Sequence, residues 1–467
     1  MKILALCLVA ACGPGPSPNT GDDDDAPPDS RPVDADPASW TSDPACTGTA
    51  ESIYTTPAQL PAERGAIIQC ALGDRMELAE TQSEMMEDGV EGVTAQTGAR
   101  VVKVAYRTQR SDGTAAVSTA TVYLPLVPRM VPAPVVLIGR PTSGIADDCA
   151  PSKKPRPERN LALPFAARGF VTITPDYAGL GNEGTHAYLD NREAATELFD
   201  GAIALQKLLP AGLVGDPVGA VGYSQGGGVV LSAQALENEL AGKRTIKGIA
   251  AIAPQWPIST RSFDYEEVLR NPDGTTATAG LAPPTVTVLR HYGYLMNKVG
   301  PQNGGDAFPA AERESIIDSI ESLCTVPLGG ALDGQQPKLR DLVDETFRVA
   351  MLACIDAGPN SAGCTGRAKQ VHAWMTGDFV SSDPAGAKVM IVQGLADQVM
   401  PAAKEAACDV AKLRAAGVEP ELCTDAFATH DTILEKKIDN VVAWIEAMAT
   451  GVAAPSCASS TMPACSR

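Results

Sequence analysis

A serine between two glycines marks the point where an apolar run changes into a helical pattern. Residues 218–221 are mostly apolar, the turn reads Gly222-Tyr223-Ser224-Gln225-Gly226, and residues 229–240 carry apolar side chains at helical spacing. A strand, a tight turn and a helix in this order form a nucleophile elbow, in which glycines allow the strand and the helix to approach closely. We therefore expect the Ser224 hydroxyl to project from the edge of a sheet, at the positive end of a helix.

An acid and a histidine downstream favour this interpretation over a glycine-rich turn with an incidental serine. Asp397 follows the apolar run 389–392, and His430 follows a strand predicted at 421–427. The chain order Ser, Asp, His is that of the α/β-hydrolases and differs from the orders in chymotrypsin and subtilisin. In such a site the histidine takes the serine proton and later gives it to the leaving alcohol. The aspartate fixes the tautomer and stabilises the imidazolium.

The base and the acid each have alternatives. His186, which follows an earlier strand, is the rival base, and the other two histidines fall in a predicted helical insertion. Asp425 and Asp431 are the alternative acids, but both are too close to His430 in the sequence for the usual placement of the carboxylate. We favour His430 as base and Asp397 as acid.

An oxyanion hole needs two backbone N–H groups aimed at the negative charge that develops in the transition state. One donor is expected to be Gln225, directly after the nucleophile. The other is expected in the loop after the apolar run 135–138, which reads Gly139-Arg140-Pro141-Thr142-Ser143-Gly144. Proline has no N–H, so Thr142 is the first usable donor and Ser143 the second choice. The alternative is that this loop only turns the chain.

The order of the apolar runs predicts an α/β-hydrolase fold with a mostly parallel central sheet. Two alternating runs, at residues 101–108 and 115–124, flank a turn and form a hairpin signal. Continuous apolar runs of the kind found in buried parallel strands occur at residues 135–138, 170–173, 218–221, 249–253 and 389–392. Helical segments lie between most of them, which implies crossover connections.

The strand pattern stops after residue 253. Residues 254–387 contain three predicted helices, at 309–324, 338–355 and 365–375, joined by loops rich in Gly and Pro. We interpret this segment as a helical cap inserted after the sixth strand, over the strand ends where ligands bind in such sheets. A helical domain unrelated to the site is the alternative. The core then comprises residues 46–253 and 388–451, followed by a tail at 452–467.

The N-terminal residues predict export. Residues 1–11 carry Lys2 and an apolar stretch too short to span a bilayer, as in a signal peptide. The stretch ends in Val9-Ala10-Ala11-Cys12, which resembles a bacterial lipobox with Cys12 as the lipidated residue and hence a membrane anchor. An ordinary secretory signal or a misassigned start codon are the alternatives. Residues 12–45 are rich in Pro, Gly, Ser and Asp, and predict a disordered acidic linker.

Charge and cysteines limit the partners. The net charge of −19 disfavours nucleic acid, and no Cys/His spacing is typical of a zinc site, so we expect neither a metal nor an organic cofactor. Of twelve cysteines, ten remain after Cys7 leaves with the signal and Cys12 is lipidated. An even set in an exported chain predicts disulfides. Their connectivity cannot be deduced, although nearness in the sequence suggests Cys408–Cys423 and Cys457–Cys465.

Together these motifs resemble the secretory lipase family of α/β-hydrolases, whose fungal members include the lipase A type. The resemblance covers roughly residues 50–450 and rests on the following pieces: Thr142-Ser143-Gly144, Cys149-Ala150-Pro151-Ser152, residues 175–181 with Asp176-Tyr177, residues 186–189, residues 222–227, residues 394–401, and His430. It implies ester hydrolysis, often of triacylglycerols, under a cap that carries the acyl tunnel. It also implies Ser224, Asp397 and His430 as nucleophile, acid and base. The chain departs from the family at Gly139-Arg140-Pro141, where relatives commonly have His-Gly before the threonine.

The sequence therefore predicts an exported serine ester hydrolase, a lipase or carboxylesterase that acts through an acyl-enzyme on Ser224. Its expected partners are an ester or lipid substrate and, through the Cys12 anchor, a membrane. A serine peptidase on the same fold and a non-catalytic surface binding protein are the alternatives.

Overall fold

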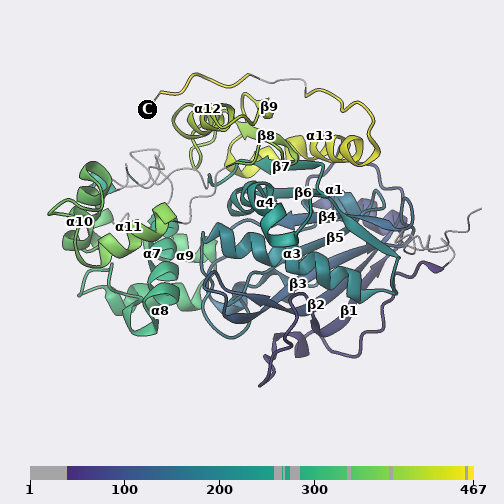
Figure 1. The fold of residues 1–467 in the computed structure, drawn as a ribbon, viewed down its shortest axis with the longest axis horizontal. Coiled ribbons are helices and arrows are strands. Elements are labelled where there is room, and N and C mark those ends of the chain that lie inside the picture. The colour runs from purple at the N-terminus through teal and green to yellow at the C-terminus, as the bar shows by residue number, and fades with distance from the viewer. Residues whose placement is uncertain are drawn as a thin grey trace, which may run out of the picture. The chain divides into compact units, whose positions relative to one another are not determined.

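Nine strands form one sheet at the centre of the computed structural model (Figure 1). The structure describes residues 39–256, 266, 269–273, 284–333, 338–377, 382–457 and 461–466. The predicted signal peptide, the lipidation site at Cys12 and most of the linker lie outside these residues. The strand order is β1-β2-β3-β5-β4-β6-β7-β8-β9.

The sheet begins antiparallel and continues parallel. β1 pairs with β2, β2 with β3, and β3 with β5 in antiparallel fashion, whereas every pair from β5–β4 to β8–β9 is parallel. The predicted α/β-hydrolase fold is confirmed. The strands are β1 (Ile67–Met76), β2 (Ala99–Gln109), β3 (Ala115–Pro125), β4 (Ala133–Gly139), β5 (Val171–Pro175), β6 (Val214–Tyr223), β7 (Gly248–Ile252), β8 (Lys388–Gly394) and β9 (Glu421–Asp425).

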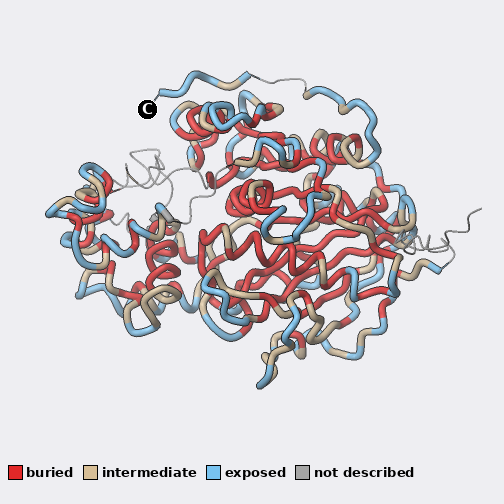
Figure 2. Tube along the Cα trace, in the orientation of Figure 1, coloured by how far each residue is buried: buried red, intermediate tan, exposed pale blue. Residues whose placement is uncertain are grey.

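Helices cover both faces of the sheet, which is why the parallel strands are apolar without alternation. In β4, Val135 and Leu137 join the apolar cluster under α3 and α4, while Val136 and Ile138 join the cluster under α2 and α13. Every residue of β4, β5 and β7 is buried (Figure 2). The helices of this part are α1 (Leu78–Glu87), α2 (Leu163–Ala166), α3 (Asn191–Leu208), α4 (Gln225–Ala241), α12 (Ala407–Ala415) and α13 (His430–Thr450).

The sequence did not predict β1, and this changes the place of the insertion in the strand count. β1 is a strand at the edge of the sheet with only two buried residues, so its apolar pattern is weak. The insertion follows β7, the apolar run expected to precede it, but β7 is the seventh strand of the chain rather than the sixth.

The described residues between β7 and β8 are mostly helical, and most of their buried apolar side chains share one cluster. Their helices, the cap helices, are α7 (Pro284–Lys298), α8 (Arg313–Ser322), α9 (Thr325–Asp333), α10 (Glu345–Ala357) and α11 (Gly366–Gly377). Their buried residues include Leu289, Ile320 and Met351, and this cluster also contains Tyr188 and Leu189 from the loop between β5 and α3. The cap helices therefore pack on the loop that precedes α3.

Five disulfides occur among the described residues, which is typical of proteins that fold in an oxidising compartment. They are Cys46–Cys70, Cys149–Cys324, Cys354–Cys364, Cys408–Cys465 and Cys423–Cys457. The pairs suggested by nearness in the sequence, Cys408–Cys423 and Cys457–Cys465, are wrong. The tail after α13 runs back over α12 and β9 (Figure 1), so each of its cysteines bonds to a different element.

Among the described residues, no helix combines the length and the apolar character needed to cross a bilayer.

Helix α3 buries acidic side chains beside the loop that precedes it. Glu197 is 1% exposed, and its Oε2 accepts a hydrogen bond of 2.8 Å from the N–H of Ala178. Burial, and then the neighbouring Glu193, raise the pKa of Glu197 from its ordinary value of 4.5 to about 8. Glu193 is itself paired with Arg110 at 2.8 Å. The folded chain therefore keeps a proton on Glu197 at pH values where the unfolded chain has lost it.

This proton makes stability depend on pH. Because the pKa in the folded state exceeds that in the unfolded state, the contribution of Glu197 is complete below about pH 4.5 and is lost as pH rises through about 8. We predict that Glu197→Gln, which keeps an acceptor for the Ala178 N–H and cannot ionise, reduces the fall in thermal midpoint between pH 5 and pH 9. The variant should be more stable than the wild type at pH 9. Thermal melts across this range measure both effects.

Glu91→Gln, which changes an exposed glutamate, is the control and should leave the pH profile unchanged. Equal slopes for the wild type and Glu197→Gln would contradict the prediction.

Candidate active site

Ser224 lies at the turn between β6 and α4 in a strained backbone conformation. Its φ of 53° and ψ of −117° are rarely adopted by residues with a side chain, and they persist only where the surroundings fix them. The Ser224 N–H donates to the Ile252 carbonyl at 2.9 Å. The Ser224 carbonyl accepts from the N–H groups of Gly227 and Gln255, each at 2.9 Å. Neighbouring elements on both sides therefore hold the turn in place.

The two glycines of the elbow allow backbone to meet backbone. A Cβ atom on Gly222 would lie 2.0 Å from the Gly226 carbonyl oxygen, and a Cβ on Gly226 would lie 1.9 Å from the Gly139 carbonyl oxygen. Both distances are far below any contact that real Cβ atoms make. The start of α4 thus packs directly on the end of β4, as expected for close approach at an elbow.

The structure brings the three predicted residues together. The Nε2 atom of His430 is 2.9 Å from the Oγ of Ser224, and its Nδ1 is 2.9 Å from the Oδ2 of Asp397. His430 is the first residue of α13, and its carbonyl accepts a hydrogen bond of 2.9 Å from the Tyr223 hydroxyl. In a neutral imidazole that donates from Nδ1 to the carboxylate, Nε2 is free to accept the serine proton.

Asp397 is buried just beyond β8, and hydrogen bonds fix its orientation. Its Oδ1 accepts from the N–H groups of Val399 at 2.8 Å and Met400 at 2.7 Å. Its Oδ2, which faces His430, also accepts from the Nε2 of Gln393 at 3.2 Å. These bonds hold Oδ2 toward the His430 ring, where it can accept from Nδ1 and stabilise an imidazolium.

The rival acid Asp425 bonds the backbone of the loop before His430. Its Oδ1 accepts from the N–H groups of Phe427 at 3.0 Å and Ala428 at 2.9 Å, and so it shapes the loop before His430. These backbone bonds are the main reason that the pKa of Asp425 lies below its ordinary value. The other alternative, Asp431, follows His430 in the first turn of α13.

The rival base His186 is directed at the residue after the nucleophile. Its Nε2 is 3.1 Å from the Nε2 of the Gln225 amide, and its ring stacks on Tyr177 with centroids 5.5 Å apart. Burial, followed by the charges of Arg140 and Arg110, holds the pKa of His186 well below its usual range. His186 is therefore a neutral hydrogen-bonding partner of Gln225, whereas His430 is the histidine in contact with Ser224.

The two predicted oxyanion donors lie on loops that other residues hold. Gln225 is the first residue of α4, so its N–H has no acceptor within the helix. Thr142 lies in the loop after β4, and its Oγ1 is 2.8 Å from the Tyr188 hydroxyl. The Nη1 of Arg140 bonds the Pro141 carbonyl and the Ser143 hydroxyl, each at 2.9 Å. That these N–H groups bind an oxyanion stays a prediction.

Sequence reasoning missed several residues that support the three side chains. Gln393 is fully buried in β8, and its amide joins Asp397 to the Met400 carbonyl at 3.0 Å. A glutamine inside a continuous apolar strand, four residues before the acid, is a signal that could have found it. The partnership of Tyr223 with the His430 carbonyl had no comparable signal, because it joins residues 207 positions apart.

Among the described residues, no group of three or more His, Cys, Asp or Glu side chains could hold a metal ion.

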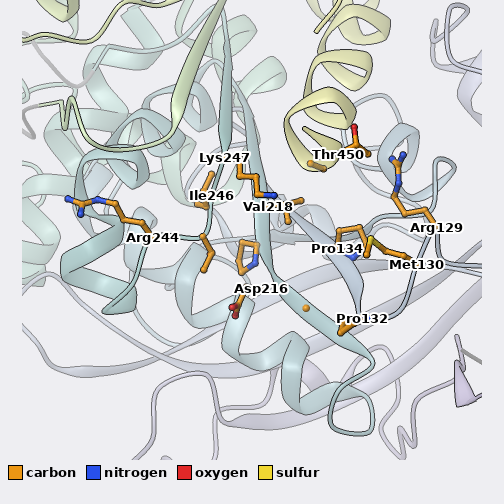
Figure 3. Close-up of a pocket in the computed structure, with 14 residues that line it drawn as sticks. Arg129, Met130, Pro132, Pro134, Asp216, Val218, Arg244, Ile246, Lys247 and Thr450 are labelled. Carbon is orange, nitrogen blue, oxygen red and sulfur yellow. The ribbon is translucent and has the colours of Figure 1, made fainter. Parts of the chain in front are cut away.

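A pocket of about 510 Å³ lies at the amino ends of the parallel strands (Figure 3). Its walls come from the start of β4, the start of β6, the residues before β7 and the end of α13. The labelled residues include Pro132, Asp216, Lys247 and Thr450. Since Ser224 follows the other end of β6, this pocket is separate from the candidate active site.

A serine at a strained turn after a parallel strand, with a later Asp and a last His within hydrogen-bonding reach, is the arrangement found in α/β-hydrolases. Comparison with solved structures leads to the same fold. Candida antarctica lipase A superposes with a TM-score of 0.62 at 18% identity, over 90% of this chain and 91% of that chain. The cell-wall-degrading esterase LipA of Xanthomonas oryzae superposes with a TM-score of 0.59 at 18% identity, over 81% and 97%.

A Legionella pneumophila protein described as a hydrolase superposes with a TM-score of 0.63 at 15% identity, covering 81% of this chain and 98% of that chain. No protein-family model and no curated protein matches the chain. These similarities show that the chain shares the fold of the lipase A-like α/β-hydrolases. The resemblance seen in the sequence is thus confirmed at the level of the fold.

The elbow generates a testable prediction. Gly226→Ala places a methyl group against the Gly139 carbonyl, so α4 must move away from β4. We expect a loss of about 1–3 kcal/mol in stability, as for other overpacked contacts. Thermal melts and the yield of soluble protein measure this loss.

Gly330→Ala is the matched control. A Cβ on Gly330, which lies within α9, would meet nothing within 4 Å, and alanine is the better helix former by about 1 kcal/mol. This variant should be as stable as the wild type or more so. Equal stability of the two variants would contradict the interpretation of the elbow.

Proposed function

We propose that this chain is an exported serine ester hydrolase, a lipase or carboxylesterase that acts through an acyl-enzyme on Ser224. The observation that carries the proposal is the His430 imidazole, which lies 2.9 Å from both the Ser224 hydroxyl and the Asp397 carboxylate. A weak nucleophile next to a base that is oriented by a third group is the signature of nucleophilic catalysis. The fold and its similarity to lipases and esterases point to the same chemistry.

In the first half of the reaction, Ser224 Oγ attacks the ester carbonyl carbon while His430 Nε2 takes its proton. Negative charge develops on the carbonyl oxygen, where the N–H groups of Gln225 and Thr142 would donate to it. The resulting imidazolium is stabilised by Asp397 through Nδ1. The carbon–oxygen bond to the alcohol then breaks, His430 gives its proton to the departing oxygen, and the acyl group stays on Ser224.

In the second half, water takes the place of the alcohol. His430 removes a proton from the water, which attacks the acyl carbon and forms a second tetrahedral intermediate over the same two donors. His430 then returns the proton to Ser224 Oγ as the carboxylic acid leaves. Because each proton passes through Nε2, the tautomer set by Asp397 is needed in both halves.

The substrate class and the location belong to the same proposal. Acyl esters, including triacylglycerols, are the substrates suggested by the lipase and esterase neighbours. Export is supported by the five disulfides. A lipid anchor at Cys12 would then hold the enzyme at a membrane. The net charge of −19 disfavours nucleic acid as a partner.

We predict that Ser224→Ala lowers the hydrolysis of p-nitrophenyl esters by about 10⁴-fold or more, because it removes the atom that forms the acyl-enzyme. Steady-state rates on a series of acyl chains from acetyl to stearoyl measure the loss and also define the preferred chain length. Ser83→Ala, at an exposed site on α1, is the matched control and should keep wild-type rates.

Two other outcomes separate the alternatives. Cleavage of peptide anilides with no activity on any ester would indicate a serine peptidase. A wild-type protein that neither hydrolyses esters nor reacts with a fluorophosphonate would indicate a binding protein on a hydrolase scaffold.

A further inference from the structure

The connection between β5 and α3, residues 176–190, is held in an unusual conformation at both ends. Tyr177 has a φ of 76° and Leu189 a φ of 66°, values that cost a residue with a side chain about 1–3 kcal/mol. Such conformations persist where the surroundings over-determine them, and they cluster at functional sites. We call residues 176–190 the clamp loop.

The side chains of Arg110 and Glu197 hold the clamp loop in place. The Nη1 of Arg110 donates to the carbonyls of Ala178 at 3.1 Å and Thr185 at 3.2 Å, which joins the two arms of the loop. Glu197 accepts from the N–H of Ala178 at 2.8 Å. The arms also touch directly, since a Cβ on Gly179 would lie 2.4 Å from the Thr185 carbonyl carbon. The loop is therefore a rigid support.

One arm of the clamp loop reaches the loop after β4. The hydroxyl of Tyr188 is 2.8 Å from the Oγ1 of Thr142, and the Tyr188 side chain is 2% exposed. Thr142 supplies one of the two N–H groups expected to face the oxyanion. A hydrogen bond to its side chain fixes where its backbone can lie.

The same arm reaches the residue after the nucleophile. The Nε2 of His186 lies 3.1 Å from the side-chain amide nitrogen of Gln225. A neutral imidazole can accept a hydrogen bond from this side-chain amide. The ring of His186 lies parallel to Tyr177, with an interplanar angle of 13°. The guanidinium of Arg140, from the loop after β4, lies 4.7 Å from the centre of the Tyr177 ring on its π system. Arg140, Tyr177, His186 and Gln225 thus form one continuous row.

From this geometry we infer that the clamp loop positions both oxyanion donors of the proposed hydrolase. Tyr188 sets the place of Thr142, and His186 sets the place of Gln225. The row from Arg140 to Gln225 fixes the distance between the two donor loops. The inference rests on the proposed function, and it makes Tyr188 and His186 positioning residues that need not touch the substrate.

Positioning of this kind has a kinetic signature. The oxyanion exists only in the tetrahedral intermediates and the transition states around them, so misplaced donors lower kcat and leave the binding of the ester largely unchanged. Loss of a whole donor costs about 10²–10³-fold in kcat. A donor that is present but poorly held should cost less, on the order of 10-fold.

Tyr188→Phe and His186→Phe test the inference. Tyr188→Phe removes only the hydroxyl that bonds Thr142, whereas His186→Phe keeps an aromatic ring and removes both ring nitrogens, including the Nε2 that faces Gln225. We expect each to lower kcat for p-nitrophenyl butyrate by roughly 10-fold with KM within about twofold of wild type. The affinity for a boronic acid that forms a tetrahedral adduct on Ser224 should fall in parallel. The double variant should show roughly the product of the two losses, since the two bonds hold different donors.

Tyr292→Phe is the matched control. Tyr292 is also 2% exposed, and its hydroxyl bonds Glu321 in the cap helices rather than a donor loop. It should keep kcat and the boronic acid affinity. Thermal midpoints of all variants show whether a loss arises from unfolding, and the kinetic constants are compared at a temperature where each variant is folded.

The outcomes are distinct. If the wild type shows Ser224-dependent hydrolysis while both variants keep kcat within twofold, or raise KM alone, the positioning role is wrong and the proposed function stands. If the wild type shows no Ser224-dependent hydrolysis, the proposed function itself is wrong. A fall in kcat and boronic acid affinity at constant KM supports the inference.

Discussion

The candidate active site depends on the two contacts of the His430 imidazole, and the rest of the structure holds the three side chains in the positions that these contacts need. Each ring nitrogen has a partner 2.9 Å away, and the partners come from chain segments far apart in sequence, Ser224 and Asp397. Three parallel elements of the sheet make this possible. β6 ends at the nucleophile, β8 ends just before the carboxylate, and β9 is followed by the loop that leads to His430. Because these strands are parallel, their carboxyl ends meet at one edge of the sheet.

The parts of this arrangement that the sequence predicts are those encoded in short segments. The elbow is visible in five residues, because only glycine allows the backbone contacts at Gly222 and Gly226. The strands β4 to β8 are visible because burial on both faces demands continuous apolar runs. By contrast, β1 pairs at an edge with mixed burial, so its pattern carries little information. Asp397 and His430 could be chosen over their rivals from chain order, although the order gives no distance.

Contacts between distant segments stay hidden from a single sequence. Cys408 bonds Cys465 and Cys423 bonds Cys457 because the tail folds back over α12 and β9, which no spacing reveals. His186 looked like a rival base because it follows a strand. The structure instead places its ring beside the side-chain amide of Gln225. Asp176 and Tyr177, which the resemblance marked, both contact Arg140: its guanidinium bonds the Asp176 carbonyl and lies over the Tyr177 ring.

Arg140 explains how the loop after β4 keeps its form without the His-Gly pair common in relatives. The side chain is fully buried, and its guanidinium bonds the carbonyls of Asp176 and Pro141 and the hydroxyl of Ser143. A guanidinium has five N–H donors in one rigid plane, which lets it bond several acceptors at once. Because the buried guanidinium is charged, it needs these acceptors to be stable inside the protein. Asp176 is in turn held by Thr119 at 2.7 Å and by the N–H of Ser152 at 3.0 Å. The Arg140 side chain and its acceptors thus form the internal scaffold of this loop.

The contact between Gly226 and the Gly139 carbonyl has a consequence for how this chain can vary. Since α4 and β4 meet there without an intervening side chain, the height of the nucleophile above the sheet is set by main-chain atoms alone. Substitutions in the apolar layers on either face of the sheet can therefore change the volume and shape of those layers while the Ser224 oxygen keeps its height above the sheet. Diversification of substrate preference is in this way uncoupled from the geometry of attack.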